Sequence, residues 1–367
     1  MNQDLLETHI HAALAGGKSN ILLSPETIDK ICRSQAASMP AEITSRFGFE
    51  CRLGNQEPDC DFLVRTGAQP EEWPAFARYA AGQSSSPWAG ISALFDARIR
   101  PALKNLWLEY DFAAVDNAPL PSVFFGTDAL ISGADIADAA RGIGFLRGRP
   151  LPPEAKRTLQ DIVAALPKKT KLFQAGIMCS RAESPLRVCL LGPEFIPGSP
   201  SENGSLRDFL AAIHWPADPS PVAERLQAFA PLLDHVALDL DIRDDGSLIP
   251  KLGLEIYQSP ATTPVHRIAA LVSQLTSSNL CTPEKADGLL AWNGLSHERL
   301  HPDLWPKSLV AARALRGGGQ YSTFCRWLHH IKLVYEPRQP MTAKSYLAVS
   351  HTFLTDCEIR EARHIDC

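Results

Sequence analysis

The sequence lacks long apolar runs and an excess of positive charge. No run approaches the ~18 apolar residues that a membrane-spanning helix requires. The first 17 residues, MNQDLLETHIHAALAGG, carry acids where a signal peptide carries Lys or Arg. Lys and Arg number 36 against 41 Asp and Glu, a net charge of −5, which excludes the electrostatic footprint of a DNA- or RNA-binding protein. We therefore expect a cytoplasmic protein with neither a membrane nor a nucleic acid as its partner.

The sequence also lacks the short motifs of known catalytic chemistries. It contains no nucleophile elbow, kinase motif set or dinucleotide-binding fingerprint, so it predicts neither a catalytic residue nor a cofactor. The string from His297 to His301 has the H-E-x-x-H spacing of zinc proteases, whose two imidazoles lie one helical turn apart. Because Pro302 disfavours a helical conformation at His301, this string predicts a loop and no metal site.

Cysteine shows no pairing pattern. The nine cysteines are an odd number and include no C-x-x-C spacing, which indicates reduced thiols. Cys51/Cys60 and Cys179/Cys189 each flank an expected hairpin turn. A zinc or redox pair is one interpretation of that placement. Buried free thiols that pack as small hydrophobic side chains are the favoured one.

Apolar residues make up 45% of the 367 positions, enough for a core in one large domain or two moderate ones. Several segments alternate polar and apolar residues with the period of a half-buried strand, and they occur in pairs separated by turn residues. The pattern predicts five β-hairpins, at 47–53/61–65, 106–112/122–126, 171–180/186–192, 236–242/251–257 and 330–336/343–350.

Helices are predicted between these hairpins. Ser24-Pro25, Thr263-Pro264 and Thr282-Pro283 each place a capping hydroxyl before a proline at the first helical position. Apolar residues with helical spacing recur at 159–166 and 268–275. The order predicts an α+β fold of repeated helix–β-hairpin–helix units, with an antiparallel sheet curled into a barrel or split into two lobes and the helices outside.

Two of the hairpins resemble each other. Glu109 and Asp111 correspond to Asp239 and Asp241 at an offset of 130 residues. The repeat predicts a duplication, with residues 1–150 as the first α/β-hairpin half and 151–367 as the second. Whether the two halves pack as one domain stays open.

The repeated carboxylates are the most informative polar residues. The strand period places both acids of each pair on one face, with large apolar side chains on the other. Neighbouring carboxylates repel, so a site that keeps both supplies a partner: a metal ion, a Lys or Arg side chain, an amide or cation of a ligand, or water. A solvated outer sheet face is one reading; the repetition favours a symmetric acidic groove.

Basic residues occur on the other hairpins, at Arg52, Lys171, Arg187, Lys332 and Lys344. If the strands form one barrel, acids and bases line a mixed-charge lumen able to hold a polar ligand or a peptide. If these faces point outward, the charges serve solubility. The candidate ligand-binding residues are Glu109, Asp111, Asp239, Asp241, Lys332, Lys344 and Tyr346.

Three segments carry a family resemblance. They are LEYDF…PSVFFG (108–126), LDLDI…IPKLGLEIY with the downstream LCTPEKADGLLAW (238–292), and HIKLVYEPRQPMTAKSYL (330–347). They resemble bacterial proteins encoded beside ribosomally made, post-translationally modified peptides, and are similar to the peptide-binding proteins of the crocagin pathway. The resemblance implies a protein that binds a precursor peptide and presents it to tailoring enzymes.

The repeated units also resemble the αββα barrel of aromatic prenyltransferases. Lys344-x-Tyr346 matches the Lys-x-Tyr pattern of that family, whereas Lys171-x-Phe173 and Lys332-x-Val334 lack the tyrosine. This resemblance implies an alternative function, a transferase acting on a peptide or aromatic acceptor with Glu109 or Asp239 as the acceptor-binding acid.

A third hypothesis is a Mg²⁺ or Ca²⁺ site built from the repeated carboxylates. Whether the protein is an enzyme, and whether it forms a homodimer, both stay open.

Overall fold

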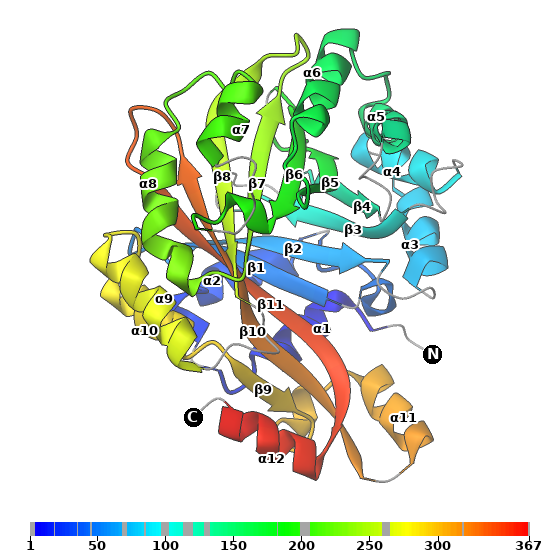
Figure 1. Ribbon diagram of the computed structural model, residues 1–367. Helices are drawn as coiled ribbons and strands as arrows, with labels where there is room; N and C mark the ends of the chain where they lie inside the picture. Colours follow the sequence, from blue (N-terminus) through cyan, green and yellow to red (C-terminus); the bar gives the residue numbers. More distant parts are fainter. Residues whose placement is uncertain are drawn as a thin grey trace.

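All five predicted hairpins are present in the computed structural model, and they pair edge to edge in one antiparallel sheet (Figure 1). The structure describes residues 4–17, 19–34, 36–44, 46–67, 72–83, 86–96, 103–112, 120–127, 133–181, 183–198, 206–258, 265–317 and 319–365. The strands are β1 (Arg46–Arg52), β2 (Cys60–Thr66), β3 (Leu103–Tyr110), β4 (Ser122–Thr127), β5 (Lys171–Ile177), β6 (Leu186–Gly192), β7 (His235–Ile242), β8 (Leu248–Tyr257), β9 (Gly294–His297), β10 (Gln320–Tyr335) and β11 (Thr342–Thr355).

The sheet closes into a ten-stranded barrel. Its strand order is β11-β1-β2-β3-β4-β5-β6-β7-β8-β10, and β10 pairs with β11 to complete the ring. The first hairpin joins the last one through the pairing of β1 with β11, in which Arg46 lies opposite Ser350 and Arg52 opposite Lys344. The predicted α+β class with helices outside is therefore confirmed, and the sheet takes the barrel form rather than two lobes.

Two strands are longer than the sequence predicts. β10 has 16 residues and β11 has 14, and their outer parts pair with each other beyond the barrel, as far as Gln320 opposite Thr355. The short strand β9, which the sequence analysis missed, pairs with this outer part of β10. Figure 1 shows the resulting extension at the bottom of the view, next to α11 (Lys307–Arg316) and α12 (Asp356–Ile365).

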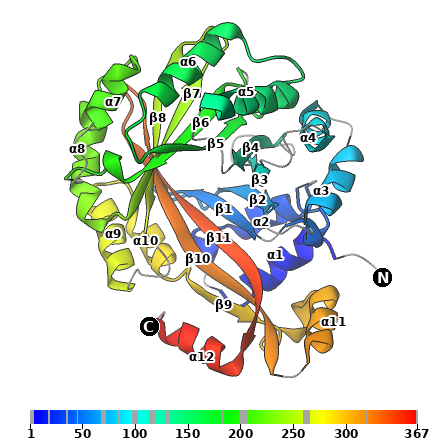
Figure 2. The same cartoon turned by 45° about the vertical axis from the view of Figure 1, so that its right-hand side comes forward.

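Helices surround the outside of the barrel (Figure 2). The remaining ones are α1 (Leu6–Leu14), α2 (Pro25–Cys32), α3 (Glu72–Ala81), α4 (Ser86–Asp96), α5 (Gly133–Arg147), α6 (Pro153–Ala164), α7 (Leu206–Ala212), α8 (Ser220–Phe229), α9 (Val265–Ser277) and α10 (Pro283–Leu290). The side chains of Ser24 and Thr282 cap α2 and α10 as predicted, while Thr263-Pro264 lies outside the described residues. None of the helices that the structure describes is long and apolar enough to cross a membrane.

The main core lies between the outer face of the barrel and these helices. On β7, Val236, Leu238 and Leu240 are fully buried within the apolar core cluster. Asp239 and Asp241 alternate with them and therefore point to the barrel interior. The same alternation on the other strands gives the barrel an apolar outside and a polar inside.

The two similar hairpins, β3–β4 and β7–β8, both belong to this barrel. One sheet thus runs through residues 1–150 and 151–367 alike. That the two halves of the chain arose by duplication stays a prediction.

The eight cysteines in the described part of the chain are free thiols. Cys51 lies directly opposite Cys60 on β1 and β2, and both are fully buried in the apolar core. Cys189 on β6 faces Gln174 of β5, and Cys179 follows the end of β5. Burial raises the pKa of the Cys60 thiol well above its ordinary value, so this thiol stays protonated.

Candidate functional site

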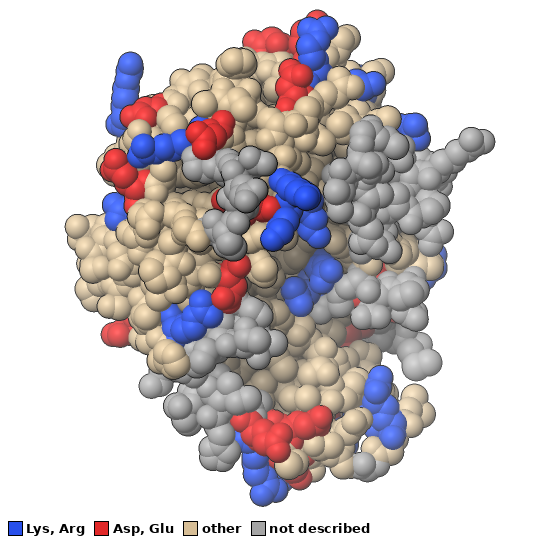
Figure 3. Space-filling model, viewed as in Figure 1, with Lys and Arg blue, Asp and Glu red and all other residues tan. Residues whose placement is uncertain are grey.

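The barrel interior contains a cavity of about 610 Å³, which we call the charged chamber. Lys and Arg side chains gather around a hollow in the face shown in Figure 3. Twelve ionisable residues line the chamber, six acids and six bases: Glu50, Asp61, Glu109, Asp111, Asp239 and Glu336, with Arg52, Arg181, Arg187, Lys251, Lys332 and Lys344. The predicted symmetric acidic groove is therefore wrong, because bases from neighbouring strands balance the acids. The barrel instead encloses a mixed-charge lumen.

The predicted residues come together around this lumen. Glu109, Asp111, Asp239, Lys332 and Lys344 all line the charged chamber. Tyr346 lines a second, smaller cavity, and Asp241 binds Arg187 of the chamber wall. The period-two alternation grouped these residues on shared strand faces, and closure of the barrel turns those faces inward.

Two lysines of the chamber form ion pairs with carboxylates on other strands. Lys332 donates to Asp239, and Lys344 donates to Glu50. Glu50 also accepts the hydroxyl of Tyr346. Burial disfavours the charged form of Glu50, but Lys344 and Lys332 outweigh it and lower its pKa to about 2. Glu50 is therefore charged and balanced by Lys344, as a buried charge requires, whereas burial raises the pKa of Asp239 above its ordinary value despite Lys332.

Arg187 holds the repeated acids of β7. Its Nε and Nη2 donate to the two oxygens of Asp241 at 2.7 and 2.9 Å, and its Nη1 lies 3.8 Å from Asp239. Burial opposes ionisation of Asp241, but Arg187 lowers its pKa below the ordinary value. The partners of these two carboxylates are thus basic side chains of the protein.

Three further ion pairs are longer and more accessible. Lys251 Nζ lies 3.5 Å from Glu336, Arg52 lies 3.7 Å from Asp61, and Arg181 lies 3.8 Å from Asp241. Lys251, Arg52 and Arg181 keep 34–37% of their side-chain surface exposed. Contacts of this length and exposure stabilise little, so these three cations are available to a ligand.

Glu109 differs from every other acid in the chamber. Among the described residues, none forms a hydrogen bond or ion pair with its carboxylate. Burial is the largest cause that raises the pKa of Glu109, to about 8. It therefore carries a proton at neutral pH. Its sequence neighbour Asp111 accepts a hydrogen bond from Ser180.

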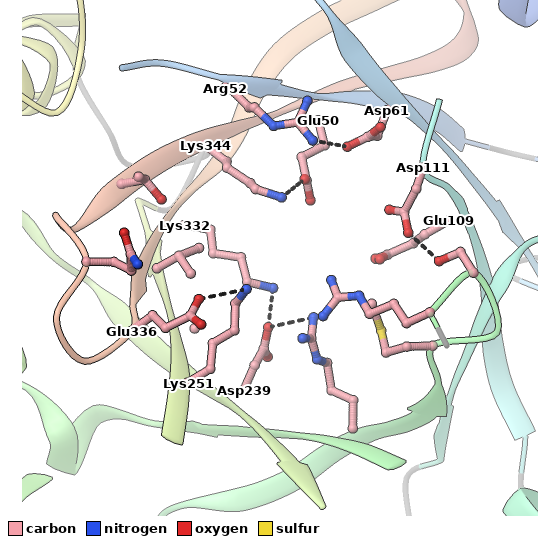
Figure 4. Close-up of a pocket in the computed structure, with 18 of the residues that line it drawn as sticks. Glu50, Arg52, Asp61, Glu109, Asp111, Asp239, Lys251, Lys332, Glu336 and Lys344 are labelled. Carbon is pink, nitrogen blue, oxygen red and sulfur yellow. Dashed lines mark hydrogen bonds and ion pairs between the residues drawn. The ribbon is translucent and has the colours of Figure 1, made fainter. Parts of the chain in front are cut away.

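The chamber has opposite walls of different character. Glu109 on β3 and Lys251 on β8 are five strands apart in the ring of ten, so they face each other across the barrel. Figure 4 shows Glu109 and Asp111 on one side of the pocket and Lys251, Lys332 and Lys344 on the other. This arrangement suits a ligand that carries both cationic and anionic groups.

One basic residue named in the sequence analysis lies outside the chamber, and several residues of the barrel interior were not predicted. Lys171, at the start of β5, is exposed and does not line the chamber. The sequence analysis missed Glu50, Asp61, Lys251, Glu255 and Glu336. Four of these lie on strands, where the two-residue period could have identified them. Glu50 shares the inner face with Arg52, and Lys251 shares it with Glu255.

The H-E-x-x-H string has no metal-binding geometry. His297 ends strand β9 and is buried, and the residues after it form a turn. Glu298 pairs with Arg313 at 2.9 Å. Among the described residues, no group of three or more His, Cys, Asp or Glu side chains is arranged to hold a metal ion.

Comparisons with known proteins leave the family open. The sequence matches no protein-family model and no curated protein. Among solved structures, the fold is similar to that of AnaPT from Neosartorya fischeri, with a TM-score of 0.40 and 12% identity over 87% of this chain and 79% of that chain. At that score neither a family nor a function follows. The resemblance to the crocagin-pathway proteins gains no support from these comparisons.

Proposed function

We propose that this protein binds a ribosomally made precursor peptide, with a short segment of it in the charged chamber, and presents it to tailoring enzymes. The observation that carries the proposal is that the loosely paired, partly exposed Lys251 faces the carboxyl groups of Glu109 and Asp111 across the chamber. A peptide offers amides, carboxylates and cations together, so it replaces water on both walls. The volume of about 610 Å³ lies within the range of ~300–1,000 Å³ that is typical of ligand sites.

The charges within the chamber divide into two roles. The pair of Lys332 with Asp239 is nearly closed to solvent, the pair of Lys344 with Glu50 is partly buried, and both hold strands together. The loosely paired Lys251 and the unpaired Glu109 remain for the ligand. A group that binds there meets the loosely paired cation of Lys251 or the protonated carboxyl of Glu109, and the match to both gives the contact its specificity.

A library of random synthetic peptides tests the proposal. Immobilised protein should retain a subset of the library, identified by mass spectrometry. Calorimetric titration of a retained peptide should show affinity lowered about tenfold or more, ~1.4 kcal/mol, by Lys251→Met and by Glu109→Gln/Asp111→Asn. The control Lys171→Met, an exposed lysine outside the chamber, should bind as wild type does. Retention of no peptide, or equal affinity in all four proteins, contradicts the proposal.

One observation favours a second candidate, a transferase of the prenyltransferase-like class acting on a peptide or aromatic acceptor. Burial raises the pKa of Glu109 to about 8, and a carboxyl that titrates near neutrality suits general acid–base chemistry. Against this, the deep lysines already bind carboxylates, which a diphosphate would have to displace. Incubation with dimethylallyl diphosphate and a retained peptide, followed by mass spectrometry, distinguishes transfer from binding alone.

A further inference from the structure

A second cavity of about 100 Å³ lies beside the charged chamber, and Glu109 lines both. We call it the aromatic chamber, because its wall contains the rings of Trp107, Phe173, Tyr257, His329, His330 and Tyr346. Glu255 lines it as well. Glu109 is thus common to the walls of both cavities.

The rings of the aromatic chamber are held in place by their own contacts. His330 stacks on Tyr346 with ring centroids 4.1 Å apart and planes 17° apart. Tyr257 lies 4.7 Å from the His330 ring and donates its hydroxyl to Glu255 at 2.5 Å. The walls are thus formed before any ligand arrives, which lowers the entropy cost of binding.

The other ionisable groups around this chamber are neutral or have contacts of their own. Burial lowers the pKa of His330 to about 3, so its stacked ring is neutral. Glu255 already has neighbours, with Lys332 at 3.5 Å and His330 at 3.7 Å. Arg46 also lines this chamber, and its guanidinium carbon lies over the Trp327 ring, 4.9 Å from the ring centroid.

We propose that the aromatic chamber binds the cationic end of an aliphatic side chain, an ammonium or guanidinium group, between its rings and the carboxylate of Glu109. Ring faces attract such cations, most strongly where water is excluded. A cation also supplies the partner that Glu109 lacks among the described residues. This inference rests on the proposed function and assigns a basic residue of the peptide to this chamber.

Binding of a cation should also release a proton. The groups that act on Glu109 from the charged chamber are Lys332, Glu50, Arg187 and Asp111; Arg46, Glu255, His329 and His330 face it from the aromatic chamber. With these unchanged, an added positive charge lowers the pKa of Glu109 below about 8 and favours its ionised form. Near neutral pH the carboxyl then loses the proton that it holds in the empty chamber.

Capped single amino acids test the inference. We expect Nα-acetyl-lysine N-methylamide to bind the full-length protein at least tenfold more tightly than the norleucine analogue, which has the same chain length without the ammonium. Trp107→Leu should lower the affinity for the lysine derivative at least tenfold. Tyr321→Leu is the matched control, because Arg299 lies over the Tyr321 ring as Arg65 lies over the Trp107 ring, but Tyr321 is on the outer part of β10.

Calorimetric titration in two buffers of different ionisation enthalpy measures the number of protons released on binding. Wild type should release up to one proton per lysine derivative bound near pH 7, and Glu109→Gln should release none. Equal binding of lysine and norleucine derivatives overturns the inference and leaves an apolar side-chain pocket. Peptide retention without lysine preference refutes this inference alone, whereas lysine binding without peptide retention refutes the proposed function alone.

Discussion

Lys332 on β10 reaches Asp239 on β7 across the intervening strand β8, where β8 carries Gly253. Gly253 lies directly opposite Asp239. A Cβ atom at this position would lie 2.7 Å from Cε of Lys332 and 3.0 Å from Cβ of Asp239. The absence of a side chain on β8 is thus what allows two charges on non-adjacent strands to meet.

Gly253→Ala should separate this pair. Its methyl group would press on both side chains, and overpacking of this kind typically costs ~1–3 kcal/mol. Urea unfolding should show that loss relative to wild type. Gly54→Ala is the control, since its nearest neighbour would be 3.9 Å away. Equal stability of the two variants would mean that the pair does not depend on Gly253.

Glu109→Gln should change how stability depends on pH. The pKa of Glu109 is about 8 in the folded protein and ~4.3 in an unfolded chain. Between these values the folded state holds a proton that the unfolded state has lost, so this group's contribution to stability falls as pH rises. The variant should melt close to wild type at pH 4 and at a higher temperature than wild type at pH 9. A constant difference between pH 4 and 9 would place the pKa of Glu109 elsewhere.

The two acidic pairs should respond differently to neutralisation. Asp239→Asn/Asp241→Asn removes both carboxylates that pair with the buried Arg187 and leaves Lys332 with Glu255 at 3.5 Å, and breaking a buried ion pair typically costs ~3–5 kcal/mol. Glu109→Gln/Asp111→Asn removes no ion pair formed within the described chain, and at pH 7 a neutral side chain replaces a carboxyl whose pKa the fold raises, so this variant should be at least as stable as wild type. Urea unfolding at pH 7 measures both. Similar stability of the two double variants would show that the repeated acids are equivalent after all.

Purified protein should hold no stoichiometric zinc at His297 and His301. His297 ends a strand, and Glu298 pairs with Arg313, so the helical spacing that zinc requires is absent. Elemental analysis measures the metal content. One zinc per chain, lost in His297→Ala, would contradict this reading.

The sequence by itself determined the five hairpins and which residues share one face of each strand. Alternation is a local property, and the turn between two strands fixes which neighbour each one pairs with. That is why Glu109, Asp239 and Lys332 could be placed on polar strand faces from their spacing alone. The caps at Ser24 and Thr282 follow from equally local chemistry.

Closure of the barrel was decided only by the tertiary structure. β1 pairs with β11, and Lys344 meets Glu50, 294 positions away in the chain. No local pattern encodes such a pairing, because it depends on how all the intervening hairpins curl. The same long-range packing converted the predicted acidic groove into a mixed-charge chamber. It also desolvated Glu109 while giving Asp239 and Asp241 their basic partners, since the pKa of a carboxyl depends on its surroundings and not on its neighbours in sequence.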